Sequence, residues 1–146
     1  LQSSKWAMPA IVLASVWKDM GYFGLMLMSG LQGINQEYYD AAAIDGAGKI
    51  KQFTRITLPL LTPTLFFVLI ISLINSFQLF TQIMIMTPDG GPLGSTMVMV
   101  ERIYKCGFRY YEMGTAAAYS WILFAILLLL TMVQMKLQNK WVNYDD

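Results

Sequence analysis

The chain has 146 residues, of which 56% are hydrophobic and 13% are charged, whereas an ordinary soluble domain is about 25% charged. Its net charge of +1 argues against a nucleic-acid partner, because phosphate binding depends on clustered Lys and Arg. No histidine and only one cysteine are present, so a disulfide framework and a multi-cysteine metal site are excluded, and we expect no cofactor and no catalytic residues. The composition favours a membrane protein.

Charged residues are clustered and leave three long apolar stretches, at about residues 8–31, 60–86 and 115–135. Each is near or above the ~20 residues that a helix needs to cross a bilayer. We therefore predict an all-α fold class, a polytopic transmembrane helical bundle with three spans that contact membrane lipid. The opening Leu-Gln-Ser-Ser-Lys lacks the basic region and apolar run of a secretory signal, so we interpret the chain as part of a longer protein.

The first apolar stretch carries charge in its middle. Lys18 and Asp19 are followed by Gly21 and Gly24, so we predict a span that is either kinked or has its polar side turned towards protein, because lipid alone cannot surround a charged pair. The pair has three possible roles: an internal salt bridge, which we favour, an extension into a water-filled cavity, or binding of a charged group of a substrate.

A polar loop at about residues 35–59 separates the first two stretches. Acidic residues open a helix, Gly46 and Gly48 interrupt it, and apolar residues then recur at helical spacing, which predicts helix, glycine turn, helix. Pro59 and Pro63 stand at the entry of the second span, where a missing N–H costs least.

The segment at about residues 87–113 separates the second and third spans. It begins with the turn sequence Thr-Pro-Asp-Gly-Gly-Pro and continues with a mixed pattern that predicts an interfacial or re-entrant amphipathic helix. The third span ends at Lys136, Lys140 and Trp141, residue types that anchor helix ends at the headgroup level. Five Lys and Arg residues lie in the central loop and the C-terminal tail, against four at the N-terminus and in the segment 87–113. This bias favours a cytoplasmic central loop and C-terminus and an external segment 87–113.

The central loop contains a spaced motif that indicates function. Asp40-Ala41-Ala42, Gly46, and Ile56-Thr-Leu58-Pro59 resemble the EAA loop of permease subunits of binding-protein-dependent ABC importers, whose signature is Glu-Ala-Ala, three residues, Gly, nine residues, then Ile-x-Leu-Pro. The departure is Asp40 in place of Glu, which keeps the carboxylate and shortens its reach by one methylene. The alternative is an interfacial amphipathic helix with no partner, and the long fixed spacing favours the EAA loop.

The resemblance implies a type I ABC importer permease fold of which these three spans are the C-terminal half, in the bacterial inner membrane with a cytoplasmic C-terminus. In that family the loop forms a coupling helix that docks on a cytoplasmic ATPase dimer, so ATP hydrolysis is expected in a partner subunit. A second homologous permease and an extracytoplasmic solute-binding protein are the other implied partners. The coupling residues carried over are Asp40, Ala41, Ala42, Asp45, Gly46, Ile56, Leu58 and Pro59.

Two further segments resemble the carbohydrate branch of the family, the maltose and glycerol-phosphate type. They are Asp89-Gly90-Gly91-Pro92 and Gly114-Thr115-Ala116-Ala117-Ala118. The implied solute is a sugar or a sugar-like molecule.

A hydroxyl-rich solute needs hydrogen-bonding side chains near mid-membrane and flat apolar faces. One face of a predicted helix in the second span carries Ser72, Asn75, Ser76 and Leu79. The resemblance adds residues of the first span to the predicted site, from a part that is broken in the family. The predicted substrate path is Ser15, Lys18, Asp19, Tyr22, Ser72, Asn75, Ser76 and Gln78. The alternative for each polar residue is a hydrogen bond between helices.

A different class of function remains open from the residues alone. A secondary transporter or channel subunit would need no ATPase, but one expects internal repeats and functional charges along its path. The chain has no visible repeat and one charged pair in mid-span, which favours the ABC importer permease.

Overall fold

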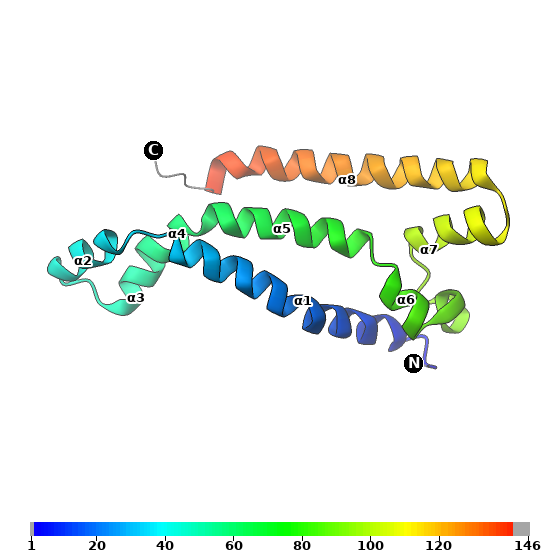
Figure 1. Ribbon diagram of the computed structural model, residues 1–146, viewed down its shortest axis with the longest axis horizontal. Helices are drawn as coiled ribbons and strands as arrows, with labels where there is room; N and C mark the ends of the chain where they lie inside the picture. Colours follow the sequence, from blue (N-terminus) through cyan, green and yellow to red (C-terminus); the bar gives the residue numbers. More distant parts are fainter. Residues whose placement is uncertain (1, 142–146) are drawn as a thin grey trace. The chain divides into compact units, whose positions relative to one another are not determined.

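The computed structural model describes the backbone of residues 2–141 and the side chains of residues 2–138, and within them it contains helices and no strand. The all-α prediction is confirmed. Figure 1 shows the helices in chain order. They are α1 (Ala7–Gln32), α2 (Gln36–Ile44), α3 (Lys49–Gln52), η1 (Phe53–Thr57), α4 (Leu58–Leu60), α5 (Thr62–Phe77), α6 (Thr81–Met86), η2 (Pro88–Gly90), η3 (Pro92–Gly94), α7 (Met99–Tyr104), η4 (Lys105–Arg109) and α8 (Met113–Trp141).

The chain divides into two compact units that share the long helices. The first unit comprises Leu1–Asp19 and Ser72–Met132, and the second comprises Met20–Ile71 and Val133–Asp146. Each unit is described by itself below. The side chains of Lys140 and Trp141, predicted as membrane anchors, lie outside the described ones.

Two helices in the described range are long and apolar enough to cross a membrane, Ala7–Gln32 and Met113–Gln138. A third arises if Lys49–Leu60 and Thr62–Phe77, bent by 59° at their junction, form one span. Only 6% and 11% of the most apolar windows of the first two helices are buried within the chain. Their apolar side chains therefore need lipid or other protein as a neighbour.

The first span is a single continuous helix in the structure. The helix α1 runs without interruption through Lys18, Asp19, Gly21 and Gly24, so the break in the first span that the family resemblance implied is wrong. Glycine costs a helix only about 1 kcal/mol relative to alanine, and a long apolar helix tolerates that loss. The break lies instead in the second span, where α5 ends at Phe77 and α6 begins at Thr81.

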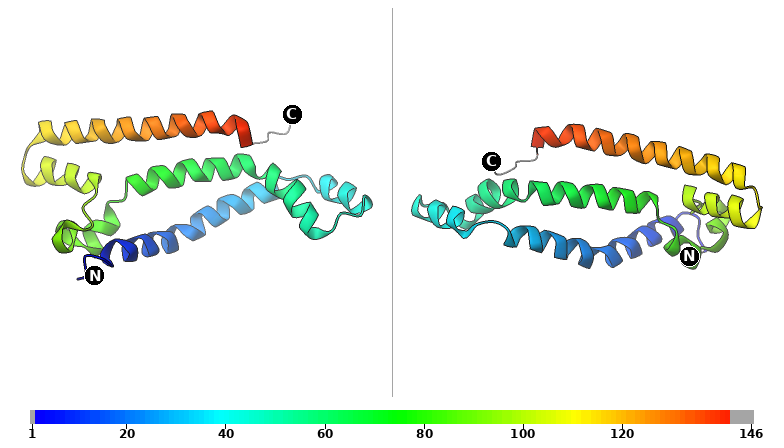
Figure 2. Two further views of the ribbon diagram at one scale, coloured as in Figure 1. Left: turned by 180° about the vertical axis from the view of Figure 1, so that it is seen from behind. Right: turned by 45° about the horizontal axis from the view of Figure 1, so that its top comes forward.

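In the second unit, α1 and α5 lie side by side (Figures 1 and 2). They are in close contact at Gly30, where a Cβ atom would stand 2.5 Å from Oγ1 of Thr64 and 2.9 Å from Cδ1 of Leu61. A side chain at this position would force Thr64 or Leu61 to move, so glycine permits the two helices to approach, as small residues do in membrane helix pairs.

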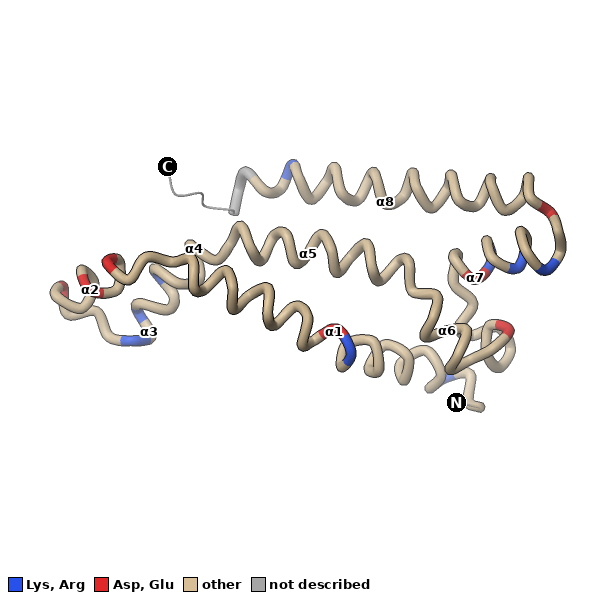
Figure 3. The backbone as a smooth tube through the Cα atoms, viewed as in Figure 1, with Lys and Arg blue, Asp and Glu red and all other residues tan. Residues whose placement is uncertain are grey.

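Charged side chains gather in two stretches of the chain. Figure 3 marks most of the charged residues on the α2–α3 segment and on the segment from α7 to the start of α8, with one further pair within α1 and single residues elsewhere. The helix α5 carries none. The segment 87–113 contains the short helix α7, which continues into the π-helical turn η4.

Candidate functional site

A cleft of about 280 Å³ lies in the first unit, between the middle of α1 and the residues on either side of the α5–α6 break. Its lining is mostly polar and contains four residues of the predicted substrate path. The lining residues are Lys18, Asp19, Asn75, Gln78, Leu79, Phe80, Thr81 and Gln82. Folding therefore brings together side chains that lie about sixty positions apart in the sequence.

The charged pair on α1 forms one wall of this cleft. Nζ of Lys18 lies 3.2 Å from Oδ1 of Asp19, and the side chains are 57% and 31% exposed. The internal salt bridge that we favoured is thus present, and the pair also borders an open cavity. The polar side of α1 is turned towards protein, which is the second of the two predicted forms of this span.

The opposite wall depends on the break between α5 and α6. Asn75 lies in the last turns of α5, and Gln78 follows the helix end, its N–H donating to the carbonyl of Ile74 at 3.1 Å. The single helical face that we predicted from Ser72 to Leu79 is wrong, because α5 ends before Leu79. The chain turns at Phe80, where φ is −124° and ψ is −56°, and its direction changes before α6.

The break also adds lining residues that the periodicity did not select. Phe80, Thr81 and Gln82 line the cleft, and the ring of Phe80 packs on that of Tyr104, with centroids 5.1 Å apart. No glycine or proline stands at residues 78–80, so the usual sequence signals of a helix end are missing here. The polar residues Gln78, Thr81 and Gln82 were the only signal in the sequence that the helix ends here.

The other predicted path residues do not line this cleft. The hydroxyl of Ser15 donates to the carbonyl of Ile11 at 2.9 Å, and that of Ser76 donates to the carbonyl of Ser72 at 2.7 Å. Such bonds to the preceding turn satisfy the hydroxyl within its own helix. Tyr22 belongs to the second unit, where its ring contacts that of Phe23 at 5.4 Å.

The second unit holds the predicted coupling loop. Helix α2 is capped by Asn35, whose side chain accepts a hydrogen bond from N–H of Glu37 at 3.1 Å. It ends in a Schellman motif: N–H of Ala47 donates to Ala42 and N–H of Gly46 donates to Ala43, at 2.9 and 3.0 Å. Gly46 has φ of +75°, a conformation that side chains disfavour.

The tip of this loop exposes apolar side chains among charged ones. Ile44 is 88% exposed and Ile50 is 83% exposed. Asp40, Asp45 and the loop's basic residues are exposed as well. Of the other predicted coupling residues, Ala41, Gly46 and Leu58 are exposed, whereas Ala42, Ile56 and Pro59 are half-buried.

Comparison with known protein families agrees with this arrangement. Residues 1–144 match the family described as binding-protein-dependent transport system inner membrane component. The chain belongs to this family. The family is that of the type I ABC importer permeases, so the resemblance drawn from the loop is confirmed, and the match covers all three apolar stretches of this permease chain.

Named relatives of this permease chain are similar over nearly its whole length. The "Probable ABC transporter permease protein YesP" of Bacillus subtilis is 36% identical over 141 residues, 96% of this chain and 45% of that protein. The "sn-glycerol-3-phosphate transport system permease protein UgpA" of Pectobacterium atrosepticum is 37% identical over 144 residues, and so is that of Shigella flexneri, with 99% of this chain and 49% of each relative covered. The chain thus spans about half the length of the curated relatives that it matches.

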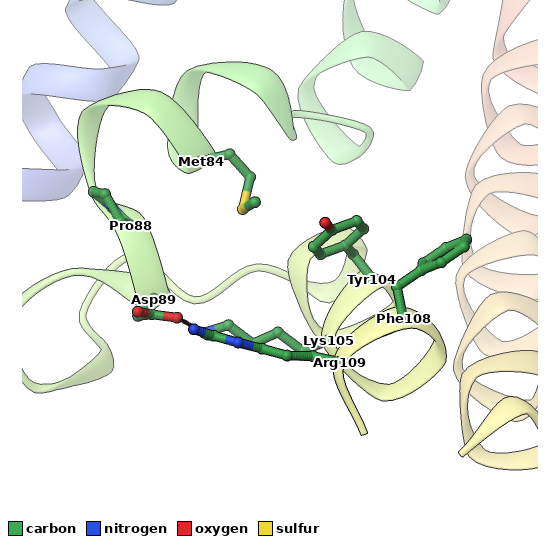
Figure 4. Close-up of a pocket in the computed structure, with 7 residues that line it drawn as sticks. All are labelled: Met84, Pro88, Asp89, Tyr104, Lys105, Phe108 and Arg109. Carbon is green, nitrogen blue, oxygen red and sulfur yellow. Dashed lines mark hydrogen bonds and ion pairs between the residues drawn. The ribbon is translucent and has the colours of Figure 1, made fainter. Parts of the chain in front are cut away.

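A second cleft of about 270 Å³ in the first unit holds an alternating set of charges (Figure 4). Asp89, in the turn after α6, forms an ion pair with Arg109, and Nζ of Lys105 lies 3.8 Å from the same carboxylate oxygen. Lys105 also lies 2.9 Å from Oε1 of Glu101, which is fully buried. The hydrogen bond and the charge of Arg109 lower the pKa of Asp89, and Asp89 in turn raises the pKa of Arg109.

These charges balance within the permease chain. Two carboxylates meet two cations, so the cluster has no excess charge with which to attract an ion. Its ion pairs join the turn at Asp89 to η4, twenty residues later. The arrangement serves to hold this segment together.

Proposed function

We propose that the chain supplies the last three spans of a permease subunit in an ABC importer of a sugar or sugar-like solute. Membership of the binding-protein-dependent transport family supports this function over a secondary transporter or channel. Two separate regions carry the two tasks, the loop at residues 35–59 for energy coupling and the cleft at Lys18 and Asn75 for solute passage. The partners are an ATPase dimer, a second permease and an external solute-binding protein, and the loop and the C-terminus face the cytoplasm.

The loop geometry supports coupling through a docked partner. Ile44 and Ile50 flank the Gly46 turn and are almost fully exposed, and exposed apolar side chains beside charges are typical of a protein contact site. Asp40 and Asp45 can add charge-assisted hydrogen bonds to such a partner. ATP-driven closure of the ATPase dimer would then move this loop and rock the spans between two access states.

The cleft is the observation that supports a hydroxyl-rich solute. Amide groups both donate and accept hydrogen bonds, as sugar hydroxyls do, and the cleft presents three of them, from Asn75, Gln78 and Gln82, beside the ring of Phe80. The name of the UgpA relatives raises a second candidate solute, a phosphorylated polyol.

The coupling proposal is tested with the intact subunit and its partners. We expect the permease to co-purify with an ATPase whose activity rises when solute-loaded binding protein is added, and we expect Gly46→Asp to abolish that association. Gly48→Asp is the matched control, because Gly48 has an ordinary φ of −68° and an added Cβ meets open space. Normal ATPase association in Gly46→Asp would contradict the coupling role.

The cleft is tested separately from assembly. We expect Asn75→Ala and Gln78→Ala to reduce solute uptake while ATPase association stays unchanged, because both side chains are exposed and lie at the cleft. Ser76→Ala serves as the control, since its hydroxyl bonds to its own helix. Equal loss of uptake and assembly would indicate a folding role instead.

A further inference from the structure

The charge balance of the α1 cleft bears on which solute it admits. Among its lining residues, all in the described part of the chain, Lys18 and Asp19 are the two charged ones. Their charged atoms are 3.2 Å apart, so the cleft has no net charge. The remaining polar groups are the amides of Asn75, Gln78 and Gln82 and the hydroxyl of Thr81.

A phosphate ester needs a different site. At neutral pH it carries roughly −1.5 to −2 charges and three strong acceptor oxygens, which proteins usually meet with several cationic donors. The cleft offers one ammonium group, and a carboxylate lies beside it. A phosphate drawn to Lys18 would approach Asp19 at nearly the same distance, so attraction and repulsion would largely cancel.

An uncharged polyol or sugar fits the same groups better. Its hydroxyls can donate to Asp19 and accept from Lys18, and the amides can serve in both ways. Leu79 and Phe80 supply apolar surface for the ring carbons. The volume of about 280 Å³ is close to the lower end of small-molecule sites, roughly 300–1,000 Å³, which suits one sugar ring or a short polyol segment.

We propose that this cleft selects an uncharged, hydroxyl-rich solute and that Asp19 is the residue that excludes phosphate esters by neutralising Lys18. The proposal rests on the proposed function, since it assumes that solute passes this cleft. It decides between the two candidate solutes in favour of the neutral one.

The experiment measures binding to the permease itself, because uptake also depends on the selectivity of the binding protein. The complete transporter is assembled in nanodiscs, and saturation-transfer NMR detects weak binding of neutral monosaccharides and disaccharides and of glycerol 3-phosphate. Assembly is checked first by ATPase co-purification, so a failure of the coupling proposal appears before any solute is added. Asn75→Ala identifies the signal that comes from this cleft.

For the wild type we expect an Asn75-dependent signal from at least one neutral sugar and none from glycerol 3-phosphate. In Asp19→Asn the cleft gains a net positive charge, and binding of glycerol 3-phosphate should rise about fivefold, which corresponds to about 1 kcal/mol, and should weaken with added salt. The double variant Lys18→Met with Asp19→Asn has no charge in the cleft and should bind glycerol 3-phosphate no better than the wild type.

Three results would overturn the proposal. One is Asn75-dependent binding of glycerol 3-phosphate by the wild type that exceeds binding of every neutral sugar. Another is an Asp19→Asn variant that assembles normally and still ignores the phosphate ester. The third is the absence of any Asn75-dependent signal across the neutral panel.

Discussion

Oη of Tyr39 lies 2.9 Å from Oγ1 of Thr57. The tyrosine is on α2, and the buried threonine is the last residue of η1, directly before α4 and the 59° bend into α5. This hydrogen bond joins the two arms of the proposed coupling loop at the point where the second span begins. Under the proposed function, this bond is a direct link by which movement of α2 would reach the start of that span.

Removal of this bond should weaken coupling more than folding. In Tyr39→Phe the ring remains and one hydrogen bond is lost, which costs about 0.5–1.5 kcal/mol. We expect the complex to assemble, with uptake reduced relative to the ATP hydrolysed. Uptake and ATPase activity measured in the same proteoliposomes give this ratio. The control is Tyr38→Phe, because Tyr38 is exposed on the same helix, and an equal fall in that variant would contradict the role of Tyr39.

The Gly46 turn should be sensitive to a single methyl group. At φ of +75° an alanine side chain costs about 1–2 kcal/mol, although an added Cβ has no neighbour within 4 Å. We expect Gly46→Ala to reduce ATPase association through the backbone alone, measured by co-purification. Gly48→Ala adds the same methyl at φ of −68° and should bind the ATPase normally. Equal behaviour of the two variants would show that backbone conformation is not the cause.

The approach of α1 to α5 should depend on Gly30. An alanine Cβ there would meet Oγ1 of Thr64 at 2.5 Å, and such overpacking typically costs about 1–3 kcal/mol. We expect Gly30→Ala to lower the melting temperature of the detergent-solubilised permease complex. Gly24→Ala is the control in the same helix, because its Cβ meets no atom of the chain within 4 Å. It should leave the melting temperature unchanged or raise it, since alanine is the better helix former.

The buried ion pair of the segment 87–113 should be needed for its folding. Glu101 is fully buried and Lys105 is 8% exposed, so Lys105→Met leaves a buried carboxylate without its cation, a loss of about 3–5 kcal/mol. Labelling of the buried thiol of Cys106, read by mass spectrometry during heating, reports local unfolding. We expect Cys106 to react at lower temperature in Lys105→Met.

The second substitution distinguishes charge from packing. Adding Glu101→Gln to Lys105→Met removes the unpaired charge and should restore part of the protection of Cys106. Arg102→Met is the control, because this cation is exposed on the same helix, and exposed charges contribute at most about 1 kcal/mol. A double variant as labile as Lys105→Met would contradict the electrostatic explanation.

The Asp89–Arg109 pair should make the same segment sensitive to acid. Arg109 lowers the pKa of Asp89 below its ordinary value of 3.8, so its stabilising effect is present above that value and is lost as the pH falls through the lowered pKa. We expect the protection of Cys106 to decline below about pH 4 and to be less dependent on pH in Asp89→Asn. Glu112→Gln, which removes another exposed carboxylate of this segment, should keep the acid response of the wild type.

The amino-acid pattern is enough to assign the class of this protein and to locate the loop that we propose for coupling. Apolar stretches long enough to span a membrane can be identified from the sequence alone, without knowledge of what they contact. The spacing from Asp40 to Pro59 is likewise a local property of the chain. Helix, glycine turn and helix follow from cap chemistry, since Asn35 and Gly46 act on backbone groups within three residues of themselves. The pairing of Lys18 with Asp19 is likewise a contact between neighbours in sequence.

Which polar residues meet depends on tertiary packing. The periodicity indicated one helical face from Ser72 to Leu79, but the helix ends at Phe77 without a glycine or proline, and the ring of Phe80 instead packs on Tyr104. That contact joins residues twenty-four positions apart, so no local pattern predicts it. The break places Gln78 and Gln82 in the same cleft as Lys18 and Asp19. The candidate solute cleft therefore depends on the arrangement of segments that are distant in sequence.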